Sequence, residues 1–432
     1  MLFLFVESSA QGVFRFDSSA EKQTISFKLL SNLIVFPMEV NGRELNFILD
    51  SGVGSTLLFN LKANDSIELK NTQKIKLQGL GSEAPVDAIL SKGNNFRFKS
   101  IVGVNQKLYV VFDDGFDLSS KLGITVHGII GYEILKDFVV NINYGTKRIS
   151  FYKPAKYNYK NCKKCDSFDL EFYKLKPYIN VRARLENNKT ITVKLLIDSG
   201  GSDAMWLFEK SHPDLVLPEK YFEDFLGEGL SGSIYGKRAF INALVLGKFV
   251  LKKPTVSFPD SISISFARRF KSRNGSLGAN ILRRFNVTFD YRRSKVYLKR
   301  NSAFKNPFRY NMSGIDLAYN GKILVKEKNE GSYALAPKVN GQSNRINLVY
   351  NYKYTFKPSY IIHKIRPNSP AFEAGLLPGD IVIKINNKFT HELKLEEIVD
   401  KFYEKENKKI TLVVERKGID YEYHFYLKNM LK

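Results

Sequence analysis

The chain has 432 residues, which predicts about three domains at roughly 150 residues each, and its 44% apolar residues are enough for sizeable cores. Its 33 Phe and 23 Tyr residues, together with scarce helix-favouring stretches, predict a mostly β protein. The net charge of +24 comes from basic residues that alternate with strand-core residues, so we expect a basic surface and no nucleic-acid partner.

The N-terminal segment 1–12, MLFLFVESSAQG, combines a short apolar run with Ser8 and Ala10, small residues typical of a signal-peptide cleavage site. The basic start of such a peptide is missing, so the segment is either a signal-peptide remnant or an ordinary N-terminal strand. We expect export to the periplasm or the medium, as a soluble chain. No later stretch approaches roughly 18 consecutive apolar residues, so stable membrane insertion is not expected.

Residues 24–155 are expected to form a first β-rich lobe. Alternating apolar residues and the tight turn Asn41-Gly42 predict a hairpin, and the next strand leads into LNFILDSGVGSTLLF. In that stretch a run of Leu, Ile and Phe residues ends in Asp50, followed by Ser51 and Gly52. A buried strand therefore delivers a carboxylate and a hydroxyl to a turn that glycine permits.

Residues 168–302 repeat this pattern and are expected to form a second lobe. The stretch VKLLIDSGGSDAMWLF places Asp198, Ser199 and Gly200 at the end of another apolar run. An ordinary capped turn would explain one Asp-Ser-Gly, because these are common turn residues. An Asp that ends a nearly apolar run in both copies must be paired or hydrogen-bonded, which favours a functional pair.

Further landmarks recur in the same order. Glycine-rich hairpin tips occur within 77–90 and 226–246, and Gly131 and Gly278 each close a short glycine-flanked run. The two Asp residues are 148 positions apart and the two closing glycines are 147 apart. An internal duplication explains this constant offset.

The segment 156–167 between the lobes is expected to be a linker and holds both cysteines of the chain, Cys162 and Cys165. In an exported protein they can close a small disulfide loop. A redox role would require a strand-to-helix context that the flanking Tyr, Asn and Lys residues do not provide. No His/Cys cluster offers four ligands, so we expect neither a metal nor a cofactor.

The C-terminal residues 305–430 are expected to form a third domain of mixed strands and helices. Residues 326–357 are polar and predict an insertion or a mobile hairpin. Ser369-Pro370 predicts the start of a short helix, and residues 393–404 an amphipathic helix.

The two lobes resemble aspartic proteases of the pepsin and retropepsin type. The resemblance covers about residues 24–300 and rests on Ile48–Gly52 and Leu196–Gly200, followed by Ile129–Gly131 and, less completely, Ser276–Gly278. It implies two β-barrel lobes around a pseudo-twofold axis, with Asp50 and Asp198 as the catalytic pair. Ser51, Gly52, Ser199 and Gly200 would then orient the carboxylates. The sequence departs from the family in having Ser for the commoner Thr, and Ser276 in place of an apolar residue.

The resemblance also implies that two hairpins cover the substrate. Their expected substrate-binding residues are Gly79, Leu80, Gly81, Gly229, Leu230 and Tyr235. The first of these flaps has no tyrosine, whereas Tyr235 lies in the second.

The C-terminal domain resembles a PDZ domain of the bacterial, protease-associated kind. The resemblance rests on Ser369–Ala371, Ala374–Leu376 and Pro378–Val382, followed by Ile385-Asn386. PDZ domains bind an extended peptide as an added strand and hold its C-terminal carboxylate with loop N–H groups. Here Met312, Ser313, Gly314, Ile315 and Leu317 would bind the peptide, opposite a helix at residues 393–403.

Together these features predict an aspartic endopeptidase, catalytically complete as a monomer, that acts on polypeptides. Two crowded carboxylates cannot both ionise, so Asp50 and Asp198 would share one proton, one acting on water as a general base and the other as a general acid. The sequence does not assign the two roles.

Two alternatives remain open from the sequence. A peptide-binding scaffold would use the same fold without cleavage. A trypsin-like serine protease would use Ser199 within Asp198–Gly201 as the nucleophile, but the only upstream histidine is His127, which lies beside Gly128.

Overall fold

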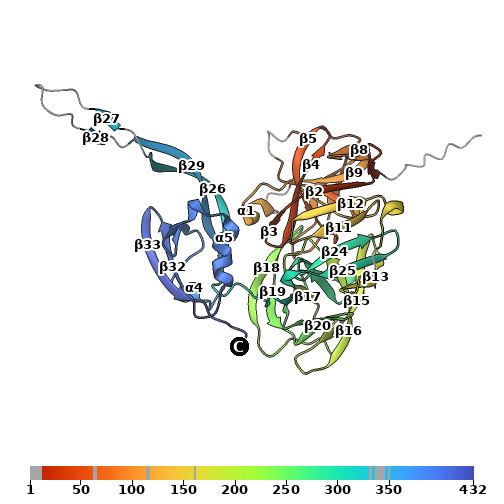
Figure 1. Cartoon of the computed structure of the whole chain (residues 1–432). Helices are drawn as coiled ribbons and strands as arrows, with labels where there is room; N and C mark the ends of the chain where they lie inside the picture. Colours follow the sequence, from red (N-terminus) through yellow and green to blue (C-terminus); the bar gives the residue numbers. More distant parts are fainter. Residues whose placement is uncertain are drawn as a thin grey trace, which may run out of the picture. The chain divides into compact units, whose positions relative to one another are not determined.

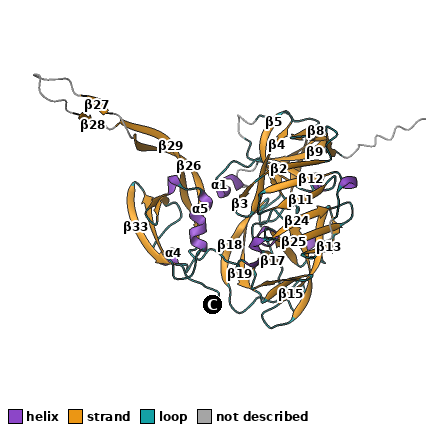
Figure 2. Ribbon diagram, in the orientation of Figure 1, coloured by secondary structure: helices purple, strands orange, loops and turns teal. Residues whose placement is uncertain are grey.

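A computed structural model of the chain describes residues 12–61, 66–112, 117–159, 162–329, 333–335, 346–348 and 351–432. The expected cleavage-site residues Ser8 and Ala10 lie outside these ranges. The chain divides into two compact units, Met1–Tyr310 with Asn429–Lys432, and Asn311–Lys428. Strands dominate and the helices are short, which confirms the mostly β prediction (Figure 2).

The first lobe is built on a nine-stranded sheet in the order β1-β9-β6-β10-β5-β4-β8-β7, with β3 paired to β4. Its strands are β1 (Val13–Phe16), β3 (Lys28–Leu30), β4 (Leu33–Val40), β5 (Arg43–Leu49), β6 (Thr56–Leu58), β7 (Gln73–Leu77), β8 (Val86–Phe98), β9 (Ile101–Val111) and β10 (Gly128–Ile130). Two short helices, α1 (Leu118–Leu122) and α2 (Tyr132–Leu135), flank β10.

The second lobe is built on a ten-stranded sheet in the order β18-β19-β22-β17-β23-β16-β15-β20-β21, with β14 paired to β15. Its strands are β14 (Glu171–Tyr173), β15 (Lys176–Arg184), β16 (Thr190–Asp198), β17 (Met205–Leu207), β18 (Phe222–Gly229), β19 (Gly232–Phe240), β20 (Ala243–Leu246), β21 (Phe249–Lys252), β22 (Thr255–Pro259) and β23 (Gly275–Gly278). The helix α3 (Ala279–Leu282) follows β23, and 3₁₀ turns lie at η2 (Pro154–Lys156), η3 (Ala267–Arg269) and η4 (Ser302–Lys305).

The two lobes repeat one another in strand pairing. In the first, β10 runs parallel to β5 and antiparallel to β6. In the second, β23 runs parallel to β16 and antiparallel to β17. The hairpins β4–β5 and β15–β16 lead into the two Asp-Ser-Gly turns in the same way.

A six-stranded antiparallel sheet joins the lobes in the order β13-β25-β24-β11-β12-β2 (Figure 1). Its strands are β2 (Lys22–Ser26), β11 (Val139–Asn143), β12 (Arg148–Tyr152), β13 (Cys165–Asp169), β24 (Phe285–Asp290) and β25 (Lys295–Arg300). Each lobe contributes three strands, and β11 pairs with β24 at the centre, where Asn141 donates to the Thr288 hydroxyl at 2.8 Å. Cys162 and Cys165 form a disulfide at the start of β13.

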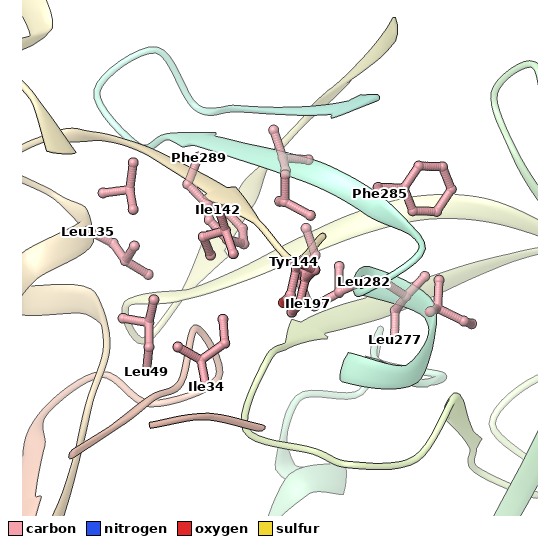
Figure 3. Close-up of a cluster of buried hydrophobic side chains, with 14 of the residues drawn as sticks. Ile34, Leu49, Leu135, Ile142, Tyr144, Ile197, Leu277, Leu282, Phe285 and Phe289 are labelled. Carbon is pink, nitrogen blue, oxygen red and sulfur yellow. The ribbon is translucent and has the colours of Figure 1, made fainter. Parts of the chain in front are cut away.

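A continuous apolar core runs through both lobes. Figure 3 shows Ile34, Leu49 and Leu135 from the first lobe in one cluster with Ile197, Leu277 and Phe285 from the second. Each of these side chains is at most 2% exposed. Because the lobes share buried apolar surface, the loops that end β5 and β16 are held in fixed positions.

The unit Asn311–Lys428 has its own six-stranded sheet, ordered β26-β29-β30-β32-β33 with β31 on β30. Its strands are β26 (Ile315–Asn329), β29 (Asn351–Ile365), β30 (Ile381–Ile385), β31 (Lys388–Phe389), β32 (Lys409–Arg416) and β33 (Ile419–Tyr426), and β27 (Tyr333–Leu335) pairs separately with β28 (Ile346–Leu348). The helices are α4 (Pro370–Glu373) and α5 (Leu395–Val399), with η5 (Thr390–Glu392) and η6 (Asp400–Tyr403).

Local signals in this unit behave as expected. The Ser369 hydroxyl caps α4 by accepting from Phe372 N at 3.3 Å, and Gly375 follows the helix with a φ of +90°. Buried Asp380 pairs with Arg416, whose Nε lies 2.6 Å from Oδ1. Among the described residues of the whole chain, no helix is long and apolar enough to cross a membrane.

Candidate active site

The Asp50 and Asp198 turns meet around one glycine. Asp50 follows β5 directly and its N–H donates to Ile130 O at 2.9 Å, while Asp198 ends β16. A Cβ placed on Gly52 would lie 3.1 Å from Oδ1 of both Asp50 and Asp198. The two carboxylates therefore flank the same small space, although 148 positions separate them in the chain.

Ser51 and Ser199 hold the two turns together with four reciprocal hydrogen bonds. Ser51 N donates to Ser199 Oγ at 2.9 Å, and Ser199 N donates to Ser51 Oγ at 3.1 Å. Each hydroxyl in turn donates across the axis, Ser51 to Ile197 O at 2.8 Å and Ser199 to Leu49 O at 2.9 Å. Both serines are buried, so these bonds fix one turn against the other.

Glycines allow this close approach. A Cβ on Gly200 would lie 2.2 Å from Asp50 Cγ, so any side chain there would displace the carboxylate. A Cβ on Gly131 would lie 1.9 Å from Asp50 O, and one on Gly278 would lie 2.3 Å from Asp203 O. The closing glycines thus let β10 and β23 pass against the loops that carry the two Asp residues.

The environment of Asp50 favours its protonated form. Burial, and then the charge of Asp198, raise the pKa of Asp50 to about 7. Hydrogen bonds from Gly52 N, at 2.6 Å, and from Gly200 N act in the opposite direction, as does the charge of Lys176. A carboxyl with this pKa can keep a proton at neutral pH and give it up during a reaction.

The two flap hairpins touch at their tips. Ser231 N donates to Leu80 O at 2.8 Å, Glu83 N donates to Ser231 O at 2.9 Å, and Gly79 N donates to Ser231 Oγ at 3.1 Å. A Cβ on Gly81 would lie 1.9 Å from Ser231 O, and one on Gly229 would lie 2.2 Å from Leu80 O. The structure therefore brings together five of the six residues expected to bind substrate.

Each flap packs its leucine on the opposite lobe. Leu230, from the second lobe, contacts a first-lobe cluster that includes Leu33 and Ile129. Leu80, from the first lobe, contacts a second-lobe cluster that includes Phe208. The sixth expected residue, Tyr235, lies further down β19, with its ring 5.6 Å from that of Phe225 and its side chain half exposed.

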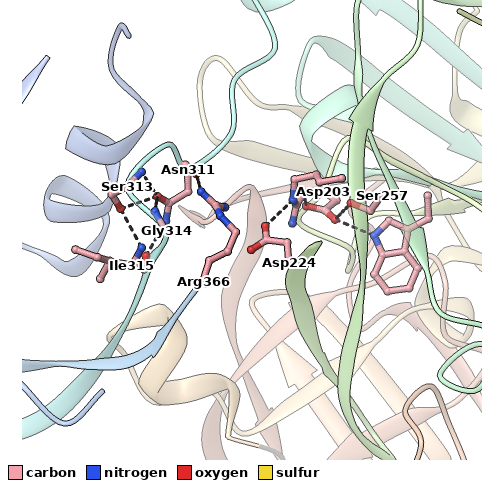
Figure 4. Close-up of polar contacts among 10 residues, drawn as sticks. Asp203, Asp224, Ser257, Asn311, Ser313, Gly314, Ile315 and Arg366 are labelled. Atoms are coloured by element: carbon pink, nitrogen blue, oxygen red, sulfur yellow. Dashed lines mark hydrogen bonds and ion pairs between the residues drawn. The ribbon is translucent and has the colours of Figure 1, made fainter. Parts of the chain in front are cut away.

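The expected peptide-binding loop of the C-terminal unit is satisfied internally (Figure 4). Asn311 Oδ1 accepts from Ser313 N at 3.0 Å and Gly314 N at 3.2 Å, and Ser313 Oγ accepts from Ile315 N at 3.0 Å. Met312 N donates to Phe402 O at 3.0 Å. Met312, Ser313, Ile315 and Leu317 are buried, and β26 lies at the edge of its sheet, where a peptide strand can add.

The contacts of Ser199 argue against the alternative in which Ser199 is the nucleophile of a serine protease. Ser199 is 1% exposed, and its hydroxyl is hydrogen-bonded to the backbone at Leu49 O and Ser51 N. His127 Nδ1 accepts from Asn46 N at 3.0 Å in the first lobe. A nucleophilic serine needs an exposed hydroxyl beside a base, and Ser199 has neither arrangement.

Sequence reasoning missed two cations near the carboxylates and an ion-pair cluster elsewhere in the second lobe. Lys176 interacts electrostatically with both Asp50 and Asp198, and Arg273 interacts with Asp198. Arg238 bridges Asp203 at 2.8 Å and Asp224 at 2.8 Å in the second lobe (Figure 4). Aligning the strands before each Asp-Ser-Gly would have placed Lys176 near Asp198, but the register of a hairpin is not evident from alternation alone.

Comparison with known families agrees with this arrangement. Residues 36–134 match the family described as aspartyl protease, and residues 361–416 match the family described as PDZ domain. A search of curated proteins found no match. The chain thus carries an aspartyl protease domain and a C-terminal PDZ domain. Asp198 lies outside the matched ranges, so the likeness of the second lobe rests on its shared strand pairing.

In the described part of the chain, no group of three or more His, Cys, Asp and Glu side chains is placed to hold a metal ion.

Proposed function

We propose that the protein is an aspartic endopeptidase that hydrolyses polypeptides with water activated between Asp50 and Asp198. The observation that carries the proposal is the placement of both carboxylates around Gly52, with the Asp50 pKa raised to about 7. Below about pH 7 such a pair holds one proton, which supplies a general base and a general acid at once. Both carboxylates come from one chain, so a monomer is catalytically complete.

The surrounding residues have supporting roles in this proposal. Ser51 and Ser199 keep the carboxylates aligned through bonds that cross the pseudo-twofold axis. The flap tips near Gly81 and Ser231 close over a bound peptide, which excludes water and fixes the scissile bond.

The test is cleavage of casein and of a peptide library by the wild-type protein, Asp50→Asn and Asp198→Asn. We expect each variant to lose at least about a hundredfold in kcat/KM, because the amide can neither share the proton nor activate water. Asp169→Asn is the matched control, since this exposed carboxylate pairs with Lys295 in the inter-lobe sheet. Cleavage that survives in both dyad variants contradicts the proposal, and binding without cleavage in the wild type favours the scaffold alternative.

The PDZ unit has a second proposed role, the recruitment of peptides or protein C-termini. The strand β26 lies at the edge of its sheet, and a C-terminal carboxylate can take the place of Asn311 Oδ1 as acceptor for the loop N–H groups. Calorimetric titration with a peptide that ends in a free carboxylate, compared with its C-terminal amide, tests this role. Equal affinity for the two peptides would count against it.

Export remains a prediction. The Cys162–Cys165 disulfide is consistent with an oxidising compartment.

A further inference from the structure

The face of the second-lobe sheet beside Asp198 carries two positive charges. The pairing of β15 with β16 sets Tyr178 opposite Leu196, and the same register carried two residues further sets Lys176 opposite Asp198. Alternate residues of a strand share a face, so Lys176 and Tyr178 lie on the face of Asp198 and Leu196. Lys176 is half-buried at the end of this face nearest the carboxylates.

Arg273 interacts electrostatically with Lys176 and is held by the next strand. Ser276 of β23 pairs with Leu196, and Arg273 donates to Ser276 Oγ at 2.6 Å and to Gly275 O at 3.0 Å. Its guanidinium also bonds to the Tyr178 hydroxyl. Arg273 is only 5% exposed, and burial of an arginine is costly unless its charge is used.

The negative charge at this face is too small to balance the two cations. No carboxylate among the described residues lies within 4 Å of Lys176 or Arg273. The acidic groups that do interact with them are Asp50 and Asp198. A pair that shares a proton carries one negative charge, so one positive charge is left over.

The first lobe has apolar residues at the equivalent positions. Leu33 stands opposite Asp50 by the register that pairs Val35 with Ile48, and Ile129 is the parallel neighbour of Ile48. Val126, three residues before Ile129, corresponds to Arg273, three residues before Ser276. Leu33, Val126 and Ile129 belong to one apolar cluster, so one of the two duplicated faces is apolar and the other is cationic.

Resting on the proposed peptidase function, we propose that this second-lobe face is a subsite for an acidic substrate side chain, with Lys176 as the contacting cation and Arg273 as a second positive charge near it. The enzyme therefore prefers to cleave substrates that carry Asp or Glu near the scissile bond. If Lys176 served only to lower the pKa of Asp50, a second buried cation, Arg273, would not be needed near it.

The test uses a peptide that the wild-type protein cleaves at one bond between apolar residues. Each of the two positions on either side of the bond is replaced in turn by Glu or by its neutral isostere Gln, and kcat/KM is measured at pH 6. We expect the Glu peptide to be preferred about tenfold or more at one position. In Lys176→Leu, which installs the first-lobe residue, the ratio should fall to about one, and in Lys176→Glu a Lys peptide should be preferred. Because the ratio compares kcat/KM for two peptides on the same enzyme, any effect of the Lys176 substitution on the two carboxylates themselves cancels.

Arg182→Leu is the matched control, because Arg182 lies on the same strand and the same face but is exposed and pairs with Thr192, away from Asp198. It should retain the wild-type ratio. A ratio near one at every position in the wild type, or an unchanged ratio in Lys176→Leu, overturns the proposal.

A binding measurement distinguishes failure of the subsite proposal from failure of the proposed peptidase function. The dissociation constants of the Glu and Gln peptides are also measured on Asp50→Asn, which needs no turnover. Preferential binding of the Glu peptide there supports the subsite even if no peptide is cleaved, and equal binding counts against it.

Discussion

At the scale of single residues, Asp50 links the proposed chemistry to stability. Its pKa is raised to about 7 by burial and by Asp198, from an ordinary value of 3.8. Between about pH 4 and pH 7 the folded state therefore binds this proton more tightly than the unfolded state. The free energy of unfolding should fall as pH rises through that window, because the charged carboxylate is disfavoured only in the folded protein.

The substitution Asp50→Asn removes this penalty. We expect the free energy of unfolding of the variant, relative to that of the wild type, to increase from pH 5 to pH 8 by on the order of 2 kcal/mol. Urea unfolding at both pH values measures the difference. Glu133, whose pKa burial also raises to about 7, titrates in both proteins, and its contribution cancels. A gain that is the same at pH 5 and pH 8 contradicts the assignment, and exposed Asp169→Asn serves as the control.

The same pKa predicts how activity depends on pH. A dyad that must hold one proton loses it as pH rises through the Asp50 value, so kcat/KM should decline above about pH 7. The pH profile of cleavage of a peptide without ionisable side chains measures this limb. A rate that still rises between pH 7 and pH 9 would sink the shared-proton mechanism.

The sequence was sufficient to predict that Asp50 and Asp198 lie together, but not which charges surround them. Asp50, Asp198 and their serines follow from a motif that occurs twice, and an Asp at the end of an apolar run has few structural explanations. Lys176 lies in a Lys- and Tyr-rich segment that looks like an ordinary polar hairpin. Its position near the carboxylates follows from the register between β15 and β16, which places it opposite Asp198 and is set by tertiary pairing.

At the scale of elements, the two flap tips can touch only because Gly81 has no side chain. This residue has a φ of +121°, and a Cβ on it would lie 1.9 Å from Ser231 O. Gly227, in the other flap, has a φ of +144° but nothing within 4 Å of an added Cβ. Both glycine-to-alanine changes strain the backbone, but only Gly81→Ala also forces the tips apart.

We therefore expect Gly81→Ala to lower kcat/KM for peptides about tenfold more than Gly227→Ala does, because the flaps no longer close over the substrate. Thermal unfolding measured in parallel shows whether both variants remain folded. Equal losses of activity in the two variants would mean that tip contact has no part in catalysis.

The flap hairpins were predictable as elements, because glycines at a tip between alternating apolar residues are a local signal. The meeting of their tips was not, since Leu80 and Ser231 come from different lobes and no local pattern encodes their contact. In the PDZ domain, likewise, the cap at Ser369 was predictable, whereas the occupation of the loop N–H groups by Asn311 was not.

At the scale of the whole molecule, the PDZ unit is an insertion near the end of the protease unit. The chain leaves the protease unit after Tyr310 and returns to it at Asn429. The Tyr310 hydroxyl donates to Asn429 Oδ1 at 2.9 Å and accepts from Met430 N at 2.6 Å. The Tyr310 ring packs against Phe222 and Phe240 of the second lobe, with ring centroids 4.9 and 6.3 Å away. The two junctions are therefore neighbours within one compact unit, a return that the sequence pattern did not reveal.

Replacing residues 311–428 by a short Gly/Ser linker should consequently leave the protease lobes intact. We expect kcat/KM for short peptides within about threefold of the wild type, while cleavage of protein substrates falls if the PDZ domain recruits them. Truncation after Tyr310 is the matched comparison, because it also removes residues 429–432 and the two hydrogen bonds to the Tyr310 hydroxyl. Its free energy of unfolding should be lower than that of the linker variant, by on the order of 1 kcal/mol per lost bond. If the linker variant is folded but does not cleave short peptides, the PDZ domain has a role in the catalytic unit itself; if the two variants are equally stable, the C-terminal return contributes nothing to the fold.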